Sequence, residues 1–568
     1  MLIGPPAVNP RPASLWPRLR RMLPALGAAA CAAPPAWAQF AGGASPLQSG
    51  GGLRSTVESL LPNAPTAVAG PEWTYGGSIT VNTGLTDNPG GVNTGNLTWL
   101  SIIQPDVHVT GNTRRLTLNF DYSPIISFYG QSNQNYVTQN LNGSATAIVV
   151  PDLFFVDTRA YVTTGSRFGG VYNNTSQVLS RDEAVQTASF SVTPYLQERF
   201  DGWGTGKVGY SFTRTSQGSD SGAQFYAVPT QTGTNPGYGT TGNLSSNQEF
   251  ASFITGENLY RVQNELDASA TQYSGGSSIY RNSYSDFVTD QVTYAVSHAI
   301  YLLASVGYED IKYNGVSGVT GYSLSDATWS VGTRLQPNPD SQITVRYGHL
   351  NGATDFNADA SYTVTPRIRL TGTYSDGVTT GLQQQQNLLN TSSVGANGLL
   401  LNSQTGAPII GNSGFGFYNS VNRAKVLTLA AYYLLARDSF SAQYVHDNET
   451  ALTNSTSVIG AAVGAGASST SDTGTIGWQH DLNANTNLFS SVSVGSVGTG
   501  LLVGSTSAGT QNTFAAYTSL THSFTETLSG SVSYSYYERS GATSNNLPSY
   551  FGGNSTQNTF LVGLRKSF

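Results

Sequence analysis

The last nine residues of the chain, FLVGLRKSF at positions 560–568, decide the fold. Phe560, Val562 and Leu564 are apolar and stand at every second position, and Phe568 keeps the same phase. Because successive side chains of a β-strand point to opposite faces, this period of two predicts a strand with one apolar face. Lys566 falls on that apolar face and is the exception in the segment.

The same alternation recurs through most of the chain. In Leu116–Tyr122 (LTLNFDY) apolar and polar residues alternate without a break. From Trp73 onward we find about twenty such segments, each near the ~10 residues with which a tilted strand crosses a bilayer. Their polar faces carry isolated Asp, Arg, Asn, Thr and Ser residues, so no second apolar face is left to build a protein core.

An apolar face without a core to cover must pack against something outside the protein. Lipid meets that need, and closing the strands into a ring pairs every backbone group. A soluble sandwich needs inner apolar faces, and a repeat solenoid would show a fixed period of roughly 20 to 50 residues, which we do not find. The sequence therefore predicts an all-β fold: a transmembrane antiparallel up-and-down β-barrel of about 20 strands (range 16–22), with short periplasmic turns and long extracellular loops.

Residues 1–38 have the order of a secretory signal peptide. A small-residue apolar run at 22–33 leads to the Ala36-Trp37-Ala38 cleavage motif. Four arginines precede the run: Arg11, Arg18, Arg20 and Arg21. A retained membrane anchor would need about 20 apolar residues, and Pro34-Pro35 end the run earlier. We therefore expect cleavage after Ala38 and export through the inner membrane.

Cleavage changes the charge and the thiol content of the chain. The formal net charge of the whole sequence is −6, and the signal peptide contains only basic charges, so the mature chain is more acidic still. This balance argues against nucleic acid as a partner. The single cysteine, Cys31, leaves with the signal peptide, which excludes disulfides and thiolate metal sites. We interpret residues 39–72 as a periplasmic extension or a small plug, and residues 73–568 as the barrel.

The predicted connections are of two kinds. Residues 365–367 and 482–485 are tight turns, whereas Thr215 to Glu257 and Asp376 to Arg423 are long and polar. Gln383 to Gln386, in the second long stretch, are interpreted as a loop or as low-complexity sequence, and as solvent-exposed in either case. Aromatic residues near strand ends favour interfacial girdles, as in Trp73-Tyr75, Tyr432-Tyr433 and Tyr536-Tyr537.

The C-terminal segment resembles the terminal strand by which outer-membrane proteins are recognised by their assembly machinery. That likeness implies a bacterial outer-membrane location, lipid and lipopolysaccharide as neighbours, and the barrel-assembly machinery as a partner through the strand that ends at Phe568. An aromatic residue is usual where Lys566 stands. A lysine at the membrane edge can extend its ammonium group to water, so we expect a small cost.

Further short motifs resemble a particular family. They are Thr86-Asp87-Asn88, Gln104-Pro105-Asp106-Val107, Gly111 to Tyr122 (GNTRRLTLNFDY), Asn140 to Ala145 (NLNGSA) and Asp152 to Asp157 (DLFFVD). This set is similar to the opening hairpins of outer-membrane β-barrel porins associated with exopolysaccharide and PEP-CTERM systems. The likeness covers residues 73–215 and the last strand. It implies a role in polysaccharide export or envelope assembly, with polysaccharide export components as partners and no catalytic residues.

Motifs for chemistry are missing from the sequence. The six histidines are scattered, none with a metal-ligand spacing such as H-x-x-x-H, and we find no G-x-S-x-G, P-loop or dinucleotide fingerprint. The histidines are His108, His298, His349, His446, His480 and His522. We therefore expect no catalytic, cofactor-binding or metal site, and no enzyme.

The polar faces of the strands supply the candidate functional residues, because inward side chains set the selectivity of a pore. The predicted pore-lining set is Asp121, Asp157, Arg159, Arg334, Arg346, Asp359 and Arg369. Either these residues line a passage for polar solutes or they fill and cross-link the interior. The leading hypothesis is a porin-like channel for polysaccharide export or polar solutes. The alternatives are a structural or adhesive barrel acting through its long loops, and a barrel hydrolase.

Overall fold

The structure is a computed structural model, and it describes most of the predicted barrel. The described residues are 72–89, 97–130, 134–166, 184–218, 242–275, 278–315, 321–394, 400–402, 420–453, 455–456, 462–463, 468–499, 509–541 and 554–568. The predicted signal peptide (1–38) lies outside them, as does the predicted extension at 39–72 except Glu72.

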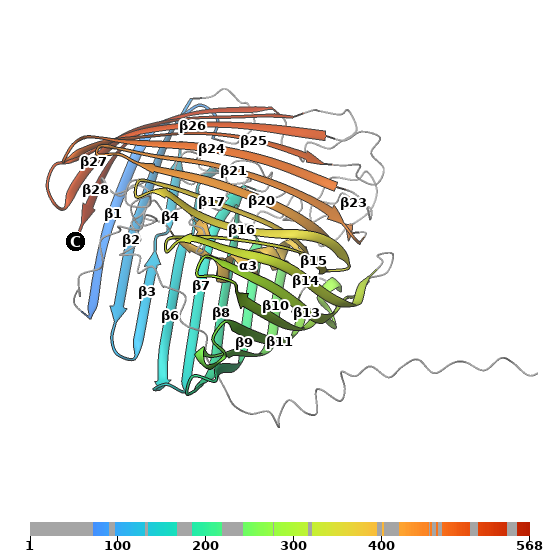
Figure 1. The fold of residues 1–568 in the computed structure, drawn as a ribbon. Helices are drawn as coiled ribbons and strands as arrows, with labels where there is room; N and C mark the ends of the chain where they lie inside the picture. The colour runs from blue at the N-terminus through green and yellow to red at the C-terminus, as the bar shows by residue number, and fades with distance from the viewer. Residues whose placement is uncertain are drawn as a thin grey trace, which may run out of the picture.

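One antiparallel sheet contains all the long strands (Figure 1). Its strands are β1 (Trp73–Thr86), β2 (Thr98–Asn112), β3 (Leu116–Tyr122), β4 (Ile125–Tyr129), β5 (Tyr136–Thr138), β6 (Leu141–Val150), β7 (Phe154–Ser166), β8 (Ala184–Phe200), β9 (Gly204–Gly218), β10 (Gly242–Thr255), β11 (Val262–Gly275), β12 (Ser283–Ala295), β13 (Ile300–Tyr313), β14 (Tyr322–Asn338), β15 (Ser341–Leu350), β16 (Ala353–Thr365), β17 (Ile368–Thr380), β20 (Val421–Leu434), β21 (Asp438–Ala451), β24 (Ser468–Asn483), β25 (Thr486–Thr499), β26 (Gly509–Ser523), β27 (Leu528–Gly541) and β28 (Ser555–Ser567).

The sheet closes on itself because β1 pairs with β28 on one side and with β2 on the other. β3 and β4 both pair with β2 and form one wall strand interrupted at Ser123-Pro124, and β5 and β6 continue each other in the same way. Counted so, the described chain forms a closed barrel of 22 strands. An antiparallel barrel is confirmed, with slightly more strands than the expected twenty.

Among the described residues, two small hairpins and three short helices are not part of the wall. They are β18 (Ser392–Val394) with β19 (Leu400–Asn402), β22 (Ser455–Thr456) with β23 (Ala462–Val463), η3 (Glu257–Leu259), η4 (Ser278–Tyr280) and α3 (Gly381–Thr391). Within the described residues no helix is long and apolar enough to cross a membrane.

The two ends of the barrel differ in their connections. At one end, the short-turn end, lie Trp73, Phe568 and the tight turns at 366–367 and 484–485, as predicted. The other end, the long-loop end, carries the connection 381–420 but also the two-residue turn Asn351-Gly352 between β15 and β16. The predicted bounds of the two long loops include residues that belong to strands. β9 continues to Gly218, β10 begins at Gly242 and β17 continues to Thr380. Residues 219–241 lie outside the described residues.

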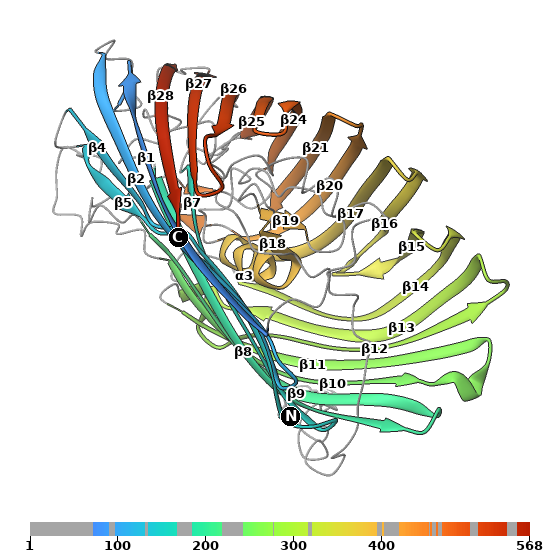
Figure 2. The same ribbon diagram turned by 90° about the vertical axis from the view of Figure 1, so that its left-hand side faces the viewer.

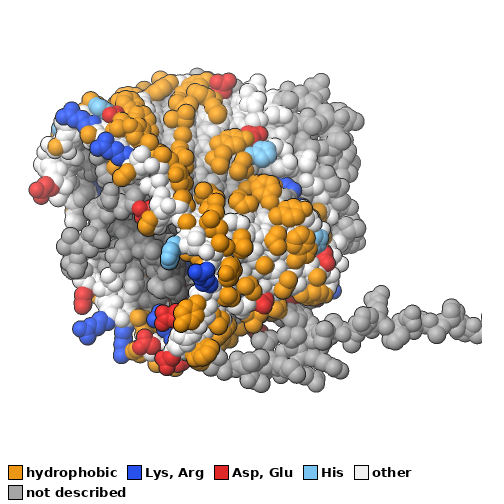
Figure 3. Space-filling view, viewed as in Figure 1, with side chains coloured by type: hydrophobic (Ala, Val, Ile, Leu, Met, Phe, Trp, Pro, Cys, Tyr) orange, Lys and Arg blue, Asp and Glu red, His pale blue; other side chains and the backbone are white. Residues whose placement is uncertain are grey.

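The outer face of the wall is apolar and the inner face is polar. On the outer face Val306 is 64% exposed and Val331 53%, and hydrophobic side chains cover much of the visible wall in Figure 3. On the inner face of β8 and β9, Ser189 and Thr215 are buried and hydrogen-bonded to each other at 2.6 Å. A closed ring with lipid-exposed apolar side chains and a polar interior belongs in the bacterial outer membrane.

The pairing of the last strand with the first shows on which face Lys566 lies. It pairs with Ile79, which is on the outer face, and its Nζ donates a hydrogen bond to Thr527 Oγ1 at 2.6 Å in the turn below. The predicted outward placement of Lys566 is therefore confirmed, and its ammonium group reaches the short-turn end of the barrel.

Aromatic side chains mark the upper edge of the apolar band, towards the long-loop end. Tyr308, Trp329, Tyr347, Phe356 and Tyr374 share the outer face of β13 to β17. The Trp329 and Tyr347 rings lie 6.1 Å apart, and those of Phe356 and Tyr374 4.4 Å.

The tandem pairs predicted for the girdle are only half right. Tyr433 and Tyr536 face outward, whereas Tyr432 and Tyr537 are buried on the inner face. Two adjacent residues of a strand cannot both face lipid.

Candidate functional site: the lumen and its internal helix

The helix α3 lies inside the ring of strands (Figure 2). It follows β17 directly, crosses the interior and contacts β7, β8, β9 and β10 on the far wall. Gln383, Gln385 and Gln386 are each only 7% exposed. The prediction that Gln383 to Gln386 are solvent-exposed is therefore wrong. Amide side chains carry no charge, so hydrogen bonds to the wall are enough to allow their burial.

Polar side chains of the wall hold α3 in place. Gln383 Nε2 donates to the Tyr313 hydroxyl at 2.7 Å, and the Tyr161 hydroxyl donates to the Gln385 carbonyl oxygen at 2.6 Å. Gln384 Nε2 donates to Glu449 Oε1 at 2.8 Å. Tyr313, Tyr161 and Glu449 come from β13, β7 and β21, so the helix is tied to widely separated parts of the ring.

A buried apolar cluster adjoins α3 at the long-loop end. Its members are Leu244, Ile279, Tyr280, Ile311, Tyr313, Leu382 and Val421. They come from the long-loop ends of β10, β13 and β20, from η4 and from α3. The Tyr280 hydroxyl lies 2.8 Å from Thr380 Oγ1 at the end of β17, and burial raises the pKa of Tyr280, which keeps that hydroxyl protonated. The cluster thus joins opposite walls around the helix.

The seven predicted pore-lining residues all lie on the inner face. Asp121 pairs with His108, and Asp157 pairs with Thr146, whose hydroxyl donates to Asp157 Oδ1 at 2.7 Å. Arg159 is two residues along β7 from Asp157. The register places them on the same side of the wall as Tyr161, which reaches α3 in the interior. That these residues line a conducting pore stays a prediction.

The remaining four members lie on neighbouring strands. Arg334, Arg346, Asp359 and Arg369 come from β14, β15, β16 and β17 in turn. Arg369 pairs with the buried Tyr432, and its Nη2 donates to Ser361 Oγ at 2.9 Å. The structure therefore brings Arg334, Arg346, Asp359 and Arg369 together, on a part of the ring far from Asp121, Asp157 and Arg159.

Sequence reasoning missed several inner-face groups. Arg565 alternates with the outward Leu564 and Lys566, so the same rule that found the set would have found it. It lies near Asp106 on β2, and both side chains are buried. Leu382 and Gln383 carried no such signal, because their place in the lumen depends on contacts with distant strands.

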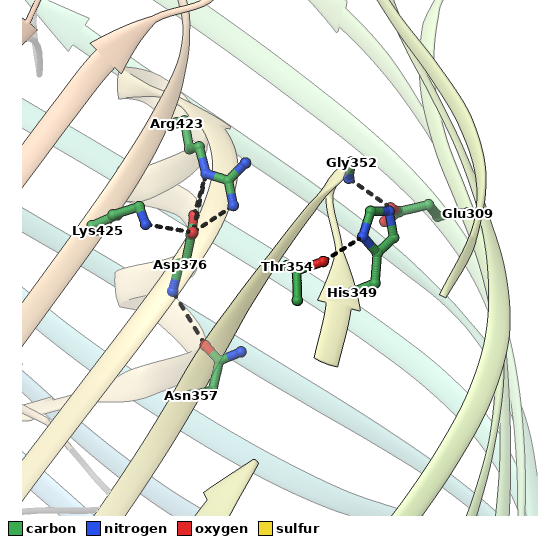
Figure 4. A network of polar contacts seen from close by, with 8 residues as sticks. All are labelled: Glu309, His349, Gly352, Thr354, Asn357, Asp376, Arg423 and Lys425. Atoms are coloured by element: carbon green, nitrogen blue, oxygen red, sulfur yellow. Dashed lines mark hydrogen bonds and ion pairs between the residues drawn. The ribbon is translucent and has the colours of Figure 1, made fainter. Parts of the chain in front are cut away.

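At the long-loop end of the barrel, the hairpin of β15 and β16 separates from the neighbouring wall strands. Its pairing with β14 stops at Trp329 and His349, and its pairing with β17 stops at Ala358 and Tyr374. The tip then turns inward, where the Gly352 amide donates to the inner-face Glu309 at 3.3 Å (Figure 4). We call this break in the rim the notch.

Charged groups flank the notch. On one side His349 Nε2 lies 2.9 Å from Asp326 Oδ2. On the other side Arg423 Nε donates to Asp376 Oδ1 at 2.8 Å, with Lys425 Nζ 3.4 Å from the same carboxylate (Figure 4). The Asp376 side chain is only 3% exposed. Across the described ranges no group of three or more His, Cys, Asp and Glu side chains could hold a metal ion.

Comparison with known proteins gives structural likeness only. No protein-family model and no curated protein matches the chain. The FrpB iron transporter of Neisseria meningitidis (F5-1 variant) is 10% identical, with a TM-score of 0.45, over 93% of this chain and 87% of that one. Pyoverdine-bound FpvA of P. aeruginosa is 12% identical, with a TM-score of 0.46, over 87% and 72%. A loop-deletion mutant of Vibrio cholerae OmpT is 9% identical, with a TM-score of 0.27, over 88% and 100%. These identities say nothing of substrate.

Proposed function

We propose that the protein is an outer-membrane channel for polar solutes and that α3 is its gate. The observation that carries the proposal is a neutral helix buried inside a polar-walled barrel. The wall presents hydroxyl, amide and mixed charged groups to the interior, as a path for hydrated solutes requires. The helix crosses that interior between β17 and the wall of β7 to β10.

The way α3 is held favours a gate over a permanent structural filling. Its described contacts are hydrogen bonds with a net contribution of about 1 kcal/mol each, or about 2 kcal/mol for the one to the Glu449 carboxylate, and the burial of Leu382 in the apolar cluster. The helix itself contains no charged residue. Withdrawing the helix would therefore break no ion pair between helix and wall. It would remove one hydrogen bond from the Glu449 carboxylate on the wall and expose that carboxylate to water. A ligand that binds the open state somewhat more tightly than the closed state is then sufficient to shift the equilibrium between them.

Planar lipid bilayers test the proposal. The α3-deleted variant replaces residues 381–391 with a Gly-Ser linker of the same length. We expect rare, small current steps from the wild-type protein and frequent, at least fivefold larger steps from the α3-deleted variant, because the helix fills the path. A matched control replaces residues 484–485, the turn between β24 and β25, with Gly-Ser and should behave as wild type. Equal conductance of the α3-deleted variant and the wild type would overturn the gate.

Polysaccharide export is a finer form of this proposal. Its support is the sequence resemblance to exopolysaccharide-associated porins. Under it, disruption of the gene should retain polysaccharide inside the cell envelope, and restoring the α3-deleted variant should release it. Recognition by the assembly machinery through the strand ending at Phe568 is likewise a proposal. It predicts that removal of Phe568 slows insertion of the barrel.

A further inference from the structure

A row of aromatic side chains crosses the inner wall below α3. Phe155, Tyr195, Phe250 and Phe287 stand on β7, β8, β10 and β12. In the register Phe155 faces Tyr195, Tyr195 faces Gly209, Gly209 faces Phe250, Phe250 faces Ser269 and Ser269 faces Phe287. The four aromatic residues therefore lie in one cross-strand row, interrupted by Gly209 and Ser269, which we call the aromatic track.

The register also fixes the side of the wall on which the track lies. The residues next to it along the strands, Leu196 and Tyr210 among them, are exposed on the outer face. Val288, which follows Phe287, pairs with the outward Tyr308. The track itself therefore faces the lumen.

Close contacts order the rings along the wall. The Phe155 and Tyr195 rings stack with centroids 5.4 Å apart. Lys207 Nζ lies 4.0 Å from the Tyr195 ring centroid and 5.5 Å from that of Phe250. A Cβ atom at Gly209 would come within 2.6 Å of Phe250 Cζ, so the phenyl ring lies over the glycine. Small residues between the aromatic ones make room for flat rings.

The upper end of the track is open to the lumen. Phe287 is 41% exposed, a value typical of the lipid-facing residues of this barrel, yet it points inward. Exposing an aromatic face to water costs free energy that a ligand with an apolar face would recover. The stacked Tyr195, at 9% exposed, is the most enclosed of the four.

Polar rows border the track on both sides. The row on the long-loop side consists of Asp157, Thr193, Ser211, Gln248, Thr271 and Ser285. The row on the short-turn side consists of Gln197, Lys207, Ser252, Asp267 and Thr289. Hydroxyl, amide and charged groups thus lie within reach of any molecule that packs on the rings.

We propose that the aromatic track binds linear oligosaccharides of pyranose sugars. A pyranose ring presents C–H groups on its faces and hydroxyl groups around its rim. Its faces suit the electron-rich faces of aromatic rings, and its hydroxyls suit the two polar rows. The proposal rests on the channel function proposed above and names a substrate class for it.

The length and slope of the track favour a chain over a single sugar. From β7 to β12 it crosses five strand intervals, about 24 Å at ~4.8 Å each. Phe155 is the second residue of β7 from the short-turn end, whereas Phe287 is the fifth residue of β12 from the long-loop end. The track therefore climbs the wall, in the direction that a transported chain would take.

Current blockade in the α3-deleted variant tests the track. Maltohexaose added at millimolar concentration should interrupt the ion current, and polyethylene glycol of similar mass should not. The double variant Phe250→Ala with Phe287→Ala should raise the half-blocking concentration about tenfold, measured relative to the unblocked current of that same variant. Phe190→Ala, which removes an outward ring from β8 that is 43% exposed, is the matched control.

Calorimetric titration of maltohexaose into the purified full chain separates the two proposals, because it needs no current. Binding heat that is lost in the double variant but kept in Phe190→Ala supports the track even if no channel is observed. Conductance without sugar-specific blockade or binding heat would overturn the track and leave the channel standing. Equal blockade of the double variant and its parent would also overturn it. Retention of the heat-induced gel shift shows that each variant has formed a barrel.

Discussion

At the scale of single residues, alternation predicts which face a side chain occupies but not what it touches. Parity put the seven candidate residues on the inner face, and Lys566 and the apolar band on the outer face, as the strand register has them. The same rule applied to Tyr432-Tyr433 shows that only one of the two can face lipid. Contacts such as the one between Gln383 and Tyr313 could not be predicted, because they join segments 70 residues apart in the chain.

Gly209 offers a test of the packing in the aromatic track. In Gly209→Ala the new Cβ would lie 2.6 Å from Phe250 Cζ, 2.7 Å from Tyr195 Cβ and 2.9 Å from the Pro194 carbonyl oxygen. Because two of these atoms cannot move without the backbone, we expect a loss of about 1–3 kcal/mol in unfolding free energy. Urea unfolding in lipid vesicles measures it.

Gly474→Ala is the control for that measurement. The nearest atom to its added Cβ is Val494 Cγ2 at 3.5 Å, an ordinary contact. This variant should match the wild type or exceed it slightly, because alanine restricts the unfolded chain. If the two substitutions had the same effect, the close packing around Gly209 would be refuted.

At the scale of elements, strands with one apolar face were predictable, and elements enclosed by the barrel were not. Each wall strand carries its own period of two, whereas α3 is a Gln-rich stretch whose burial depends on the wall around it. Tertiary contacts override local composition in such a case. The inward turn of β15 and β16 was hidden for the same reason: both strands alternate normally.

The ion pairs beside the notch should differ in importance. Arg423→Ala leaves the nearly buried Asp376 carboxylate with Lys425 at 3.4 Å as its remaining basic partner there. We expect a loss of about 3 kcal/mol in unfolding free energy, because removing one partner of a buried ion pair is costly and the partly exposed Lys425 compensates the carboxylate only in part. Asp326→Asn should cost much less, because that carboxylate is 41% exposed.

The same urea titration compares the two variants. A larger effect of Asp326→Asn than of Arg423→Ala would contradict this. It would show that the contact between His349 and Asp326, and not the ion pair at Asp376, stabilises the strand ends beside the notch. Arg423→Lys keeps the positive charge and should recover part of the stability, although a lysine cannot reproduce the paired geometry of the guanidinium group.

At the scale of the whole molecule, closure of the ring followed from one physical constraint. Strands with a lipid-facing side must pair every backbone group, and a ring is the way to do so. The count of 22 strands lies at the top of the predicted range, because several connections proved shorter than their polar composition indicated. The outer-membrane location follows from the wall, whereas the selectivity of the proposed channel would depend on the inner face.

Cysteine labelling in intact cells tests the central claim that a water-filled lumen is closed by α3. Ser330→Cys places a thiol on the inner face of β14, and Val331→Cys places one on the outer face beside it. With a membrane-impermeant sulfonated maleimide added outside, we predict labelling of Ser330→Cys in the α3-deleted background only, and of Val331→Cys in neither background. Equal labelling of Ser330→Cys with and without α3, or strong labelling of Val331→Cys, would contradict the account.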